Sequence, residues 1–263
     1  MSLFTGTASY YRQYRPGIPE EVATVLDQAV APGKPRRLLD IGTGTGLVAE
    51  ALLSRFDDII AIDNDADMLK AAEEALRPQL PDGASLSLIE STAEDFKPPT
   101  GWQADLVTIC RAFHWLDQAT VLALLDDQVA PGGAVAIFGD NSFWAADSPW
   151  KQSVRGVVQS FLGEERRAGN STFKHHNRPY SEIMEESPFN RVEEIRVPVH
   201  RTWSTNSILG YLYSTSFAAP HLFGGRLDEF EAAVETALAE HSTEDVFPED
   251  NEFLIRIGRR GTE

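Results

Sequence analysis

Residues 38–46 read Leu-Leu-Asp-Ile-Gly-Thr-Gly-Thr-Gly, and a helix-forming run from Leu47 to Arg55 follows them. The apolar start and Asp40 predict a buried strand, and the three glycines predict a tight turn that leads into a helix. Glycine permits the positive backbone angles of such a turn and places no side chain between the backbone and a ligand. Free N–H groups at the start of the helix point back at the turn. The stretch therefore predicts a strand, loop and helix that hold a cofactor against bare backbone.

Two kinds of cofactor are held by a glycine loop of this type. A dinucleotide loop carries a pyrophosphate at the helix N-terminus, and the third glycine of its pattern packs the helix on the strand. Residues 44–49 fit that pattern if Ala49 replaces the last glycine, so the spacing alone leaves NAD open. Asp40 lies two positions before Gly42 and favours the other kind. A carboxylate there is poorly placed beside a pyrophosphate and well placed beside a cationic group.

Acidic residues also follow the next two predicted strands. Residues 59–62 form an apolar run that ends at Asp63, 17 residues after Gly46. A carboxylate at this position can accept hydrogen bonds from both hydroxyl groups of a ribose, which NAD and other adenosine cofactors share. Asp65 is predicted to cap a helix with a buried stripe of apolar residues at helical spacing. Residues 86–89 predict a third strand, which leads into the acidic turn of residues 90–96.

A fourth strand is predicted at residues 104–110, and the run from Arg111 to Asp117, which contains Phe-His-Trp at 113–115, follows its carboxyl end. Ligands of open α/β sheets lie beyond the carboxyl ends of the strands. We therefore expect this run to flank the reacting group. Residues 131–133, Pro-Gly-Gly, predict the turn into a fifth strand at residues 134–138.

This order of motifs resembles the class I S-adenosylmethionine-dependent methyltransferases, and the Phe-His-Trp run looks like the small-molecule branch that includes the trans-aconitate methyltransferases. Residues 10–19, Tyr-Tyr-Arg-Gln-Tyr-Arg-Pro-Gly-Ile-Pro, resemble the Tyr-x-x-Tyr-Arg-Pro lead-in of the same branch, which folds over the cofactor. The resemblance covers residues 10 to 138 with specific motifs and is architectural beyond them. It implies S-adenosylmethionine as the cofactor, with its amino-acid end on the glycine loop.

The resemblance also implies individual contacts to this cofactor. Arg15 offers a bidentate donor for its carboxylate, and Met68 is placed against the adenine ring. The turn at Ala93 and Glu94 is implied to read the adenine, with Asp95 as the alternative to Glu94. The cofactor-binding residues expected on this basis are Tyr14, Arg15, Asp40, Gly42, Thr43, Gly44, Gly46, Asp63, Asn64, Met68, Ala93, Glu94 and Arg111.

On the acceptor side, His114 is the candidate catalytic base, because imidazole titrates near neutral pH and this one follows the fourth strand. Asp117 or Asp140 would take the proton if His114 does not, and Asp147 is a further acidic candidate near the acceptor. The expected substrate-binding residues are Tyr10, His114, Trp115, Asp117, Asp140 and Tyr211. No metal site is expected, since His175 and His176 have no third ligand nearby in the sequence.

The fold expected for the chain is a doubly wound, seven-stranded Rossmann-like α/β sheet whose last strand is antiparallel, with a mainly helical cap. Residues 1–36 are expected to form lid helices, and residues 37–138 the cofactor-binding core. Residues 139–189 are expected to form a substrate cap. Residues 190–263 are expected to supply strands six and seven with inserted helices. Strand six is predicted at 191–203 and strand seven at 253–259.

The charge balance bears on the partners. Forty acidic and 23 basic residues give a formal net charge of −17, and such an excess repels nucleic acids and anionic lipids and attracts cations. We expect a cationic small-molecule acceptor, specifically an amine of an aminoglycoside amino sugar of an antibiotic pathway, by general likeness to such enzymes. An O-methyltransferase for a neutral hydroxylated metabolite is the close alternative. An NAD-dependent oxidoreductase and a non-catalytic S-adenosylmethionine-binding protein are the alternatives from other classes.

Composition limits the location of the protein. One cysteine excludes an internal disulfide, and neither a signal segment nor an apolar stretch of the roughly 20 residues that span a bilayer is found in the sequence. We therefore expect a cytoplasmic protein that binds neither membrane nor nucleic acid. The sequence leaves the oligomeric state open.

Overall fold

The computed structural model describes residues 6–33, 35–141, 143, 148–163, 167–168, 171–172 and 178–261. The chain divides into two compact units. The sheet unit consists of Gly17–Asp140, His176–Val197 and Phe253–Glu263, and the helical unit consists of Met1–Pro16, Asn141–His175 and Pro198–Glu252. The division at residues 36, 138 and 189 that the sequence favours stays a prediction. Asp147, His175 and His176 lie outside the described residues.

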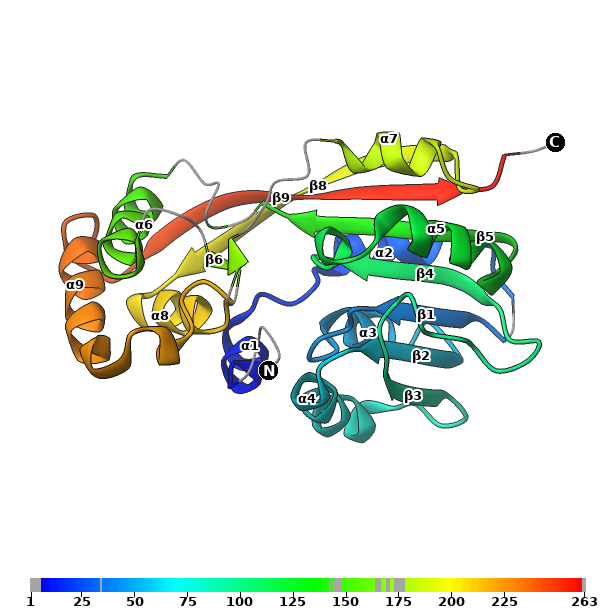
Figure 1. Ribbon diagram of the computed structural model, residues 1–263, viewed down its shortest axis with the longest axis horizontal. Coiled ribbons are helices and arrows are strands. Elements are labelled where there is room, and N and C mark those ends of the chain that lie inside the picture. Colours follow the sequence, from blue (N-terminus) through cyan, green and yellow to red (C-terminus); the bar gives the residue numbers. More distant parts are fainter. Residues whose placement is uncertain are drawn as a thin grey trace. The chain divides into compact units, whose positions relative to one another are not determined.

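In the described part of the chain, seven strands form one sheet in the order β3-β2-β1-β4-β5-β9-β8 (Figure 1). The paired strands from β1 to β5 are parallel, and β9 is antiparallel to β5. This topology confirms the predicted doubly wound sheet with an antiparallel last strand. The strands are β1 (Arg37–Ile41), β2 (Asp58–Asp63), β3 (Ser85–Glu90), β4 (Ala104–Cys110), β5 (Val129–Asp140), β8 (Arg191–Trp203) and β9 (Phe247–Arg259).

The central strands are apolar because the sheet is covered on both faces. Leu39 of β1 lies opposite Ile60 of β2 and Val107 of β4, and all three side chains are buried. The same register places Asp40 opposite Thr108. The carboxyl ends of β1, β2 and β4 therefore meet at one edge, where each strand delivers a polar residue into otherwise apolar surroundings.

Helices of the sheet unit follow the strands in the expected alternation. Asp65 caps α4, because its carboxylate accepts hydrogen bonds from the N–H groups of Asp67 and Met68. Leu69, Ala72 and Leu76 form the buried face of α4 that the sequence predicts. The helices are α2 (Glu20–Gln28), α3 (Leu47–Leu52), α4 (Ala66–Leu76), α5 (Gln118–Gln128) and α7 (Tyr180–Glu185), with short 3-10 turns η1 (Arg77–Gln79) and η2 (Phe113–Trp115).

The helical unit is built around aromatic side chains. Helix α6 packs against α9, and α1 packs against α8. Phe230, Val234 and Leu238 of α9 are fully buried and form its apolar face. The elements of this unit are α1 (Ala8–Tyr14), α6 (Pro149–Leu162), β6 (Arg167–Ala168), β7 (Ser171–Thr172), α8 (Thr205–Tyr213), η4 (Pro220–Leu222), η5 (Gly224–Arg226) and α9 (Leu227–Ala239), and β6 pairs with β7.

Some boundaries differ from those predicted. Helix α3 ends at Leu52 and not at Arg55, because the chain continues in tight turns with N–H groups bonded to carbonyls three residues back. Strand β9 begins at Phe247, six residues before the predicted start. On α6, the buried apolar residues are Trp150, Val154 and Val158. Among the described residues, no helix is long and apolar enough to cross a bilayer.

Gly210 provides a test of how α1 is held. A Cβ atom built at Gly210 would lie 2.2 Å from Cγ of Tyr14, so α1 contacts the backbone of α8 directly. Gly210→Ala is expected to displace Tyr14 and to lower the free energy of unfolding by about 1–3 kcal/mol. Gly156→Ala is the matched control, because Gly156 lies in α6 with open space around it, and alanine there should stabilise the helix by up to about 1 kcal/mol. Urea denaturation measures both, and equal effects would contradict the close packing.

Candidate functional site

The glycine loop between β1 and α3 requires its glycines. Gly42, Gly44 and Gly46 have φ angles of 66°, 54° and 83°, in the left-handed region. A Cβ atom at Gly42 would lie 2.6 Å from Cβ of Ala112, and one at Gly46 would lie 2.8 Å from Cδ1 of Leu76. The loop is thus packed against the turn after β4 on one side and against α4 on the other. Its backbone position is fixed before any ligand binds.

Asp40 at the end of β1 is a buried carboxylate. Its side chain accepts a hydrogen bond of 2.7 Å on Oδ1 from the hydroxyl of Thr108. Among the described residues, none bonds to its other oxygen, Oδ2. Burial raises the pKa of Asp40 to about 6, and the side chains of Thr43 and Thr108 offset part of this rise. An orphaned carboxylate oxygen at the base of a glycine loop fits a ligand that brings a positively charged donor.

Asp63 connects the end of β2 to the glycine loop. Its Oδ2 accepts a hydrogen bond of 2.8 Å from the N–H of Gly44, and its Oδ1 accepts one of 3.0 Å from the N–H of Asp65. Burial raises the pKa of this carboxyl above its usual value, and the two backbone bonds act in the opposite direction. Each carboxylate oxygen has a second lone pair. The carboxylate is therefore oriented by the backbone and can still accept bonds from ribose hydroxyls.

The residues expected around the adenine differ in their surroundings. Met68 and Ala93 are buried, and Ala93 packs in the main apolar cluster of the sheet unit. Glu94 Oε1 accepts a hydrogen bond of 2.9 Å from the N–H of Asp117, whereas Asp95 closes a local turn with the hydroxyl of Thr92. Of the two acidic side chains, Glu94 is the one that connects this turn to the segment after β4. Asn64 lies between Asp63 and the cap of α4.

Arg111 has a left-handed backbone, with φ of 55°, at the carboxyl end of β4. Its N–H donates to the carbonyl of Phe138, and its Nε donates to Oδ1 of Asp140 at 2.7 Å. The guanidinium also lies over the ring of Phe253, 5.4 Å from its centre. A positive φ in a residue other than glycine is strained, and these contacts hold it. The strained turn brings Ala112 against Gly42 and joins the ends of β4 and β5.

The Phe-His-Trp run forms the 3-10 turn η2. Phe113 is buried against Tyr180, whereas Trp115 is 41% exposed. The ring of His114 lies 4.6 Å from that of Trp115, centre to centre. The other candidates for the base have structural partners, because Asp117 caps α5 by accepting from the N–H of Thr120 and Asp140 pairs with Arg111. The assignment of His114 as the base stays a prediction.

Four of the expected site residues belong to the helical unit. The guanidinium of Arg15 lies between the rings of Tyr11 and Tyr211, 4.8 and 4.6 Å from their centres. Tyr10 stacks near Tyr14 and meets the edge of Tyr213. The structure thus brings Tyr10, Tyr14, Arg15 and Tyr211 together in one aromatic group, and their roles toward the cofactor and acceptor stay predictions.

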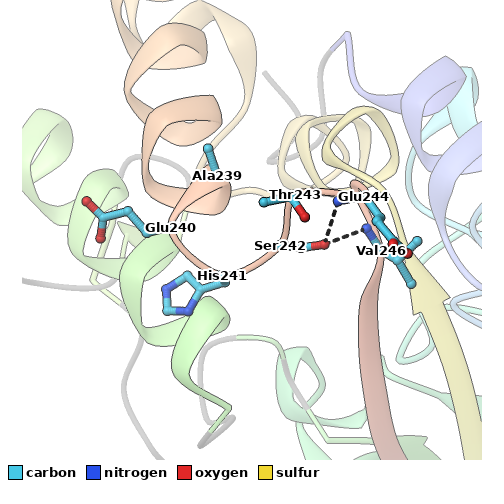
Figure 2. Close-up of a pocket in the computed structure, with 7 residues that line it drawn as sticks. All are labelled: Ala239, Glu240, His241, Ser242, Thr243, Glu244 and Val246. Atoms are coloured by element: carbon cyan, nitrogen blue, oxygen red, sulfur yellow. Dashed lines mark hydrogen bonds between the residues drawn. The ribbon is translucent and has the colours of Figure 1, made fainter.

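A surface hollow of about 440 Å³ lies along the loop between α9 and β9 (Figure 2). Residues 239–244 and Val246 line it, and none of the expected site residues is among them. The hydroxyl of Ser242 accepts from the N–H groups of Glu244 and Val246, and His241 bonds to Ser153. No group of three metal-ligating side chains occurs among the described residues. These hydrogen bonds stabilise the turn that forms the hollow, and we assign the hollow no role in the candidate site.

The part of the chain that carries the glycine loop is similar to methyltransferases. Residues 38–133 match the family model described as a methyltransferase domain. An uncharacterized methyltransferase of Mycobacterium tuberculosis is 33% identical over 138 residues, which cover 52% of each chain. A trans-aconitate 2-methyltransferase of Rhizobium leguminosarum is 30% identical over 131 residues, covering 45% of this chain and 48% of that protein.

The stretch that matches this family model, residues 38–133, is referred to below as the methyltransferase domain. The matched stretch spans about half the length of the curated relatives. A solved structure from Anaeromyxobacter dehalogenans, described as a type II methyltransferase, has a TM-score of 0.62 at 19% identity and covers 93% of this chain and 97% of that one. This likeness shows that the fold extends beyond the methyltransferase domain.

Sequence reasoning missed two residues of the methyltransferase domain. Thr108 supplies the hydrogen bond to Asp40, and Ala112 packs against Gly42. Both lie in or just after β4, 68 and 70 positions from their partners. Thr108 could have been found by aligning β1 and β4 as parallel neighbours, because that register pairs it with Asp40. Ala112 carries no such signal, since its position depends on the left-handed backbone of Arg111.

The buried carboxylate of Asp40 gives a prediction for stability. Its pKa of about 6 in the folded state lies above the usual 3.8, so the folded protein holds this proton more tightly than the unfolded chain does. The stabilisation is fully present below pH 3.8 and is lost as the pH rises from there through 6. Relative to Asp40→Asn, the wild type should lose about 2.4 kcal/mol of unfolding free energy between pH 4 and pH 7, since one pKa unit corresponds to about 1.4 kcal/mol and part of the effect is already lost at pH 4.

Urea denaturation of the ligand-free protein at a series of pH values measures this difference. Thr108→Val provides a second variant, because loss of its hydrogen bond should raise the pKa of Asp40 further and enlarge the decrease. Parallel curves for wild type and Asp40→Asn would show that Asp40 is not the titrating group.

Proposed function

We propose that the whole chain is an enzyme that transfers a methyl group from S-adenosylmethionine to a small-molecule acceptor. The observation that carries this proposal is the pair of carboxylates around the glycine loop. Asp40 presents an unpartnered, buried oxygen, and Asp63 is oriented by the N–H groups of Gly44 and Asp65. One carboxylate suits a cationic amino group and the other suits ribose hydroxyls. Both groups occur in this cofactor, and the pyrophosphate of NAD offers no partner for Asp40.

When bound, the cofactor supplies a methyl group on a sulfonium, which is electrophilic without further activation. The residues of the chain then have three tasks. Asp40, Asp63 and the loop hold the ligand, with Met68, Ala93 and Glu94 toward the adenine as the resemblance implies. The turn η2 lines the acceptor side, where alignment of nucleophile and methyl group lowers the barrier. His114 accepts the proton that the acceptor nitrogen or oxygen loses.

The methylated atom is proposed to be an amine of a cationic metabolite, with an aminoglycoside amino sugar as its most specific form. Support for this choice comes from the net charge of −17, which attracts cations over long distances. A neutral hydroxyl acceptor is the second candidate. Relatives that share about half the chain carry the name trans-aconitate 2-methyltransferase, which shows that domains of this kind also serve acidic acceptors. The acceptor class therefore depends on contacts outside the methyltransferase domain.

The cofactor assignment is tested by ligand-induced stabilisation. S-Adenosylmethionine and S-adenosylhomocysteine should each raise the melting temperature, because a ligand at 100 times its Kd adds about 2.7 kcal/mol to a folded state that alone binds it. Asp63→Asn keeps an acceptor for one backbone N–H and should weaken both ligands about tenfold or more, while Asp82→Asn, at an exposed loop residue outside the site, should leave them unchanged. A shift produced by NADH and by neither of these ligands would replace the proposal with an oxidoreductase.

Catalysis and mere binding are separated by turnover. A panel of amines and hydroxylated metabolites is incubated with the cofactor, and acceptors are identified by the mass gain of one methyl group. His114→Asn should then lower kcat about 100-fold with cofactor affinity unchanged, and His221→Asn, an exposed histidine in η4, serves as the control. An unaltered kcat would exclude His114 as the base. Tight cofactor binding without any methylated product would favour the non-catalytic binding protein.

A further inference from the structure

Gln118 is a buried polar residue of the sheet unit. It is the first residue of α5, and its exposed fraction is only 8%. A buried amide costs free energy unless it is hydrogen-bonded, and Nε2 of Gln118 donates to the carbonyl of Phe113 at 3.1 Å. Because a carbonyl oxygen can only accept, the amide nitrogen and not the amide oxygen must face it. The bond therefore connects α5 to η2, the turn that precedes it.

The direction of this bond follows from the place of Gln118 on the helix. Side chains of an α-helix point toward its N-terminus, so a residue of the first turn covers the segment before the helix. Asp117 caps α5 by accepting from the N–H of Thr120, and this cap fixes where the helix begins. The amide of Gln118 is thereby directed at η2.

Turn η2 has little stability of its own. The N–H of Trp115 donates to the carbonyl of Ala112 at 2.9 Å, and the N–H of Leu116 donates to the carbonyl of Phe113 at 3.3 Å. A 3-10 turn of three residues is marginal, because its hydrogen-bond geometry is poorer than that of an α-helix and few bonds offset the ordering of the backbone. Contacts from other elements are needed to hold it in one conformation.

The printed contacts of η2 with other elements act at different points of the turn. The buried ring of Phe113 meets the ring of Tyr180 edge-on, with 5.0 Å between their centres. The N–H of Asp117, which follows the turn, donates to Oε1 of Glu94 at 2.9 Å. The first contact fixes a side chain, and the second fixes a residue beyond the turn. The bond from Gln118 is the one among these three that holds the backbone of η2 itself.

We infer that Gln118 is a positioning residue for methyl transfer, which fixes η2 and through it the side chains of His114 and Trp115. The inference deepens the proposed function and rests on it for the role of η2 in catalysis, whereas the fixing of the turn does not. The two rings lie 4.6 Å apart on successive residues, so a rotation of the turn displaces both. A displacement of about 1 Å can lower a rate about 100-fold. A residue behind the turn can therefore affect catalysis without contact with the acceptor.

Gln128 is a matched control on the same helix. It is also 8% exposed, and its Nε2 also donates to a phenylalanine carbonyl, that of Phe96, at 3.3 Å. It is the last residue of α5, so its bond holds the end of the helix that lies away from η2. Methionine replaces each glutamine by an unbranched side chain without the amide donor. Gln118→Met and Gln128→Met should therefore lower the midpoint of urea denaturation by similar amounts.

The conformation of η2 is followed by NMR in the ligand-free protein. The indole N–H resonance of Trp115, identified by its loss in Trp115→Phe, should shift in Gln118→Met. The backbone amide of Trp115 should exchange its hydrogen about three to ten times faster in this variant. Once an acceptor is identified by mass gain, Gln118→Met should lower kcat about tenfold with cofactor affinity unchanged. Gln128→Met should leave the Trp115 signals and kcat as in the wild type.

An unchanged Trp115 resonance, or equal changes in the two variants, would show that Gln118 does not fix η2. A shifted resonance with the kcat of the wild type would also overturn the inference, because the hold on the turn would then have no part in catalysis. If Gln118→Met does not fold, Gln118→Glu replaces it, since an ionised carboxylate keeps the shape of the side chain and has no donor. The same changes are expected of it.

Failure of the proposed function gives a different pattern. S-Adenosylmethionine would then not stabilise the protein, or His114→Asn would keep the kcat of the wild type. The Trp115 resonance of the ligand-free protein would still respond to Gln118→Met. In that case Gln118 fixes the turn, and its assignment to methyl transfer is wrong.

Discussion

The hydrogen bond from the N–H of Gly44 to Asp63 is the interaction on which the site depends. It joins the loop after β1 to the end of β2, and the same carboxylate accepts from the N–H of Asp65, which caps α4. Three elements are thereby fixed by one side chain. Because the loop glycines also contact Ala112 and Leu76 without a Cβ atom between, the loop has no room to adopt another path. The cofactor site is therefore formed by the fold and does not need the ligand to assemble it.

Much of this arrangement could be predicted from the sequence, since its signals are local. Alternating and apolar runs in the sequence predict strands β1 to β5. The antiparallel last strand follows from the family resemblance, and the cap at Asp65 follows from its position before an apolar stripe. The predicted strand ends are less accurate where pairing with a neighbouring strand determines where the strand begins. β9 begins at Phe247 and not at residue 253, and β5 begins at Val129, where it already pairs with Ala104 across a bulge. Neither pairing leaves a local mark in the sequence.

The remaining parts could not be predicted because they depend on contacts between distant segments. Arg15 and Ser214 are 199 positions apart, and Lys151 meets Glu249 across 98 positions. Net charge, which the sequence does give, is a sum over the surface and acts at long range. The acidic composition therefore describes what the surface attracts over long distances, and not which side chains contact one another.

The buried carboxylate of Asp40 explains why the domain suits a cationic ligand better than a pyrophosphate. Folding removes this group from water and leaves one oxygen without a partner. Burial raises its pKa to about 6, so that keeping the carboxylate charged at neutral pH costs folding free energy. A ligand with an ammonium group beside Oδ2 recovers this free energy, since opposite charges attract strongly where water is excluded. A second anion would increase the penalty, because like charges at short range repel by a comparable amount. The free energy that burial of Asp40 takes from folding is thus returned by binding, and it is returned only to a cofactor that carries a positive charge at this end.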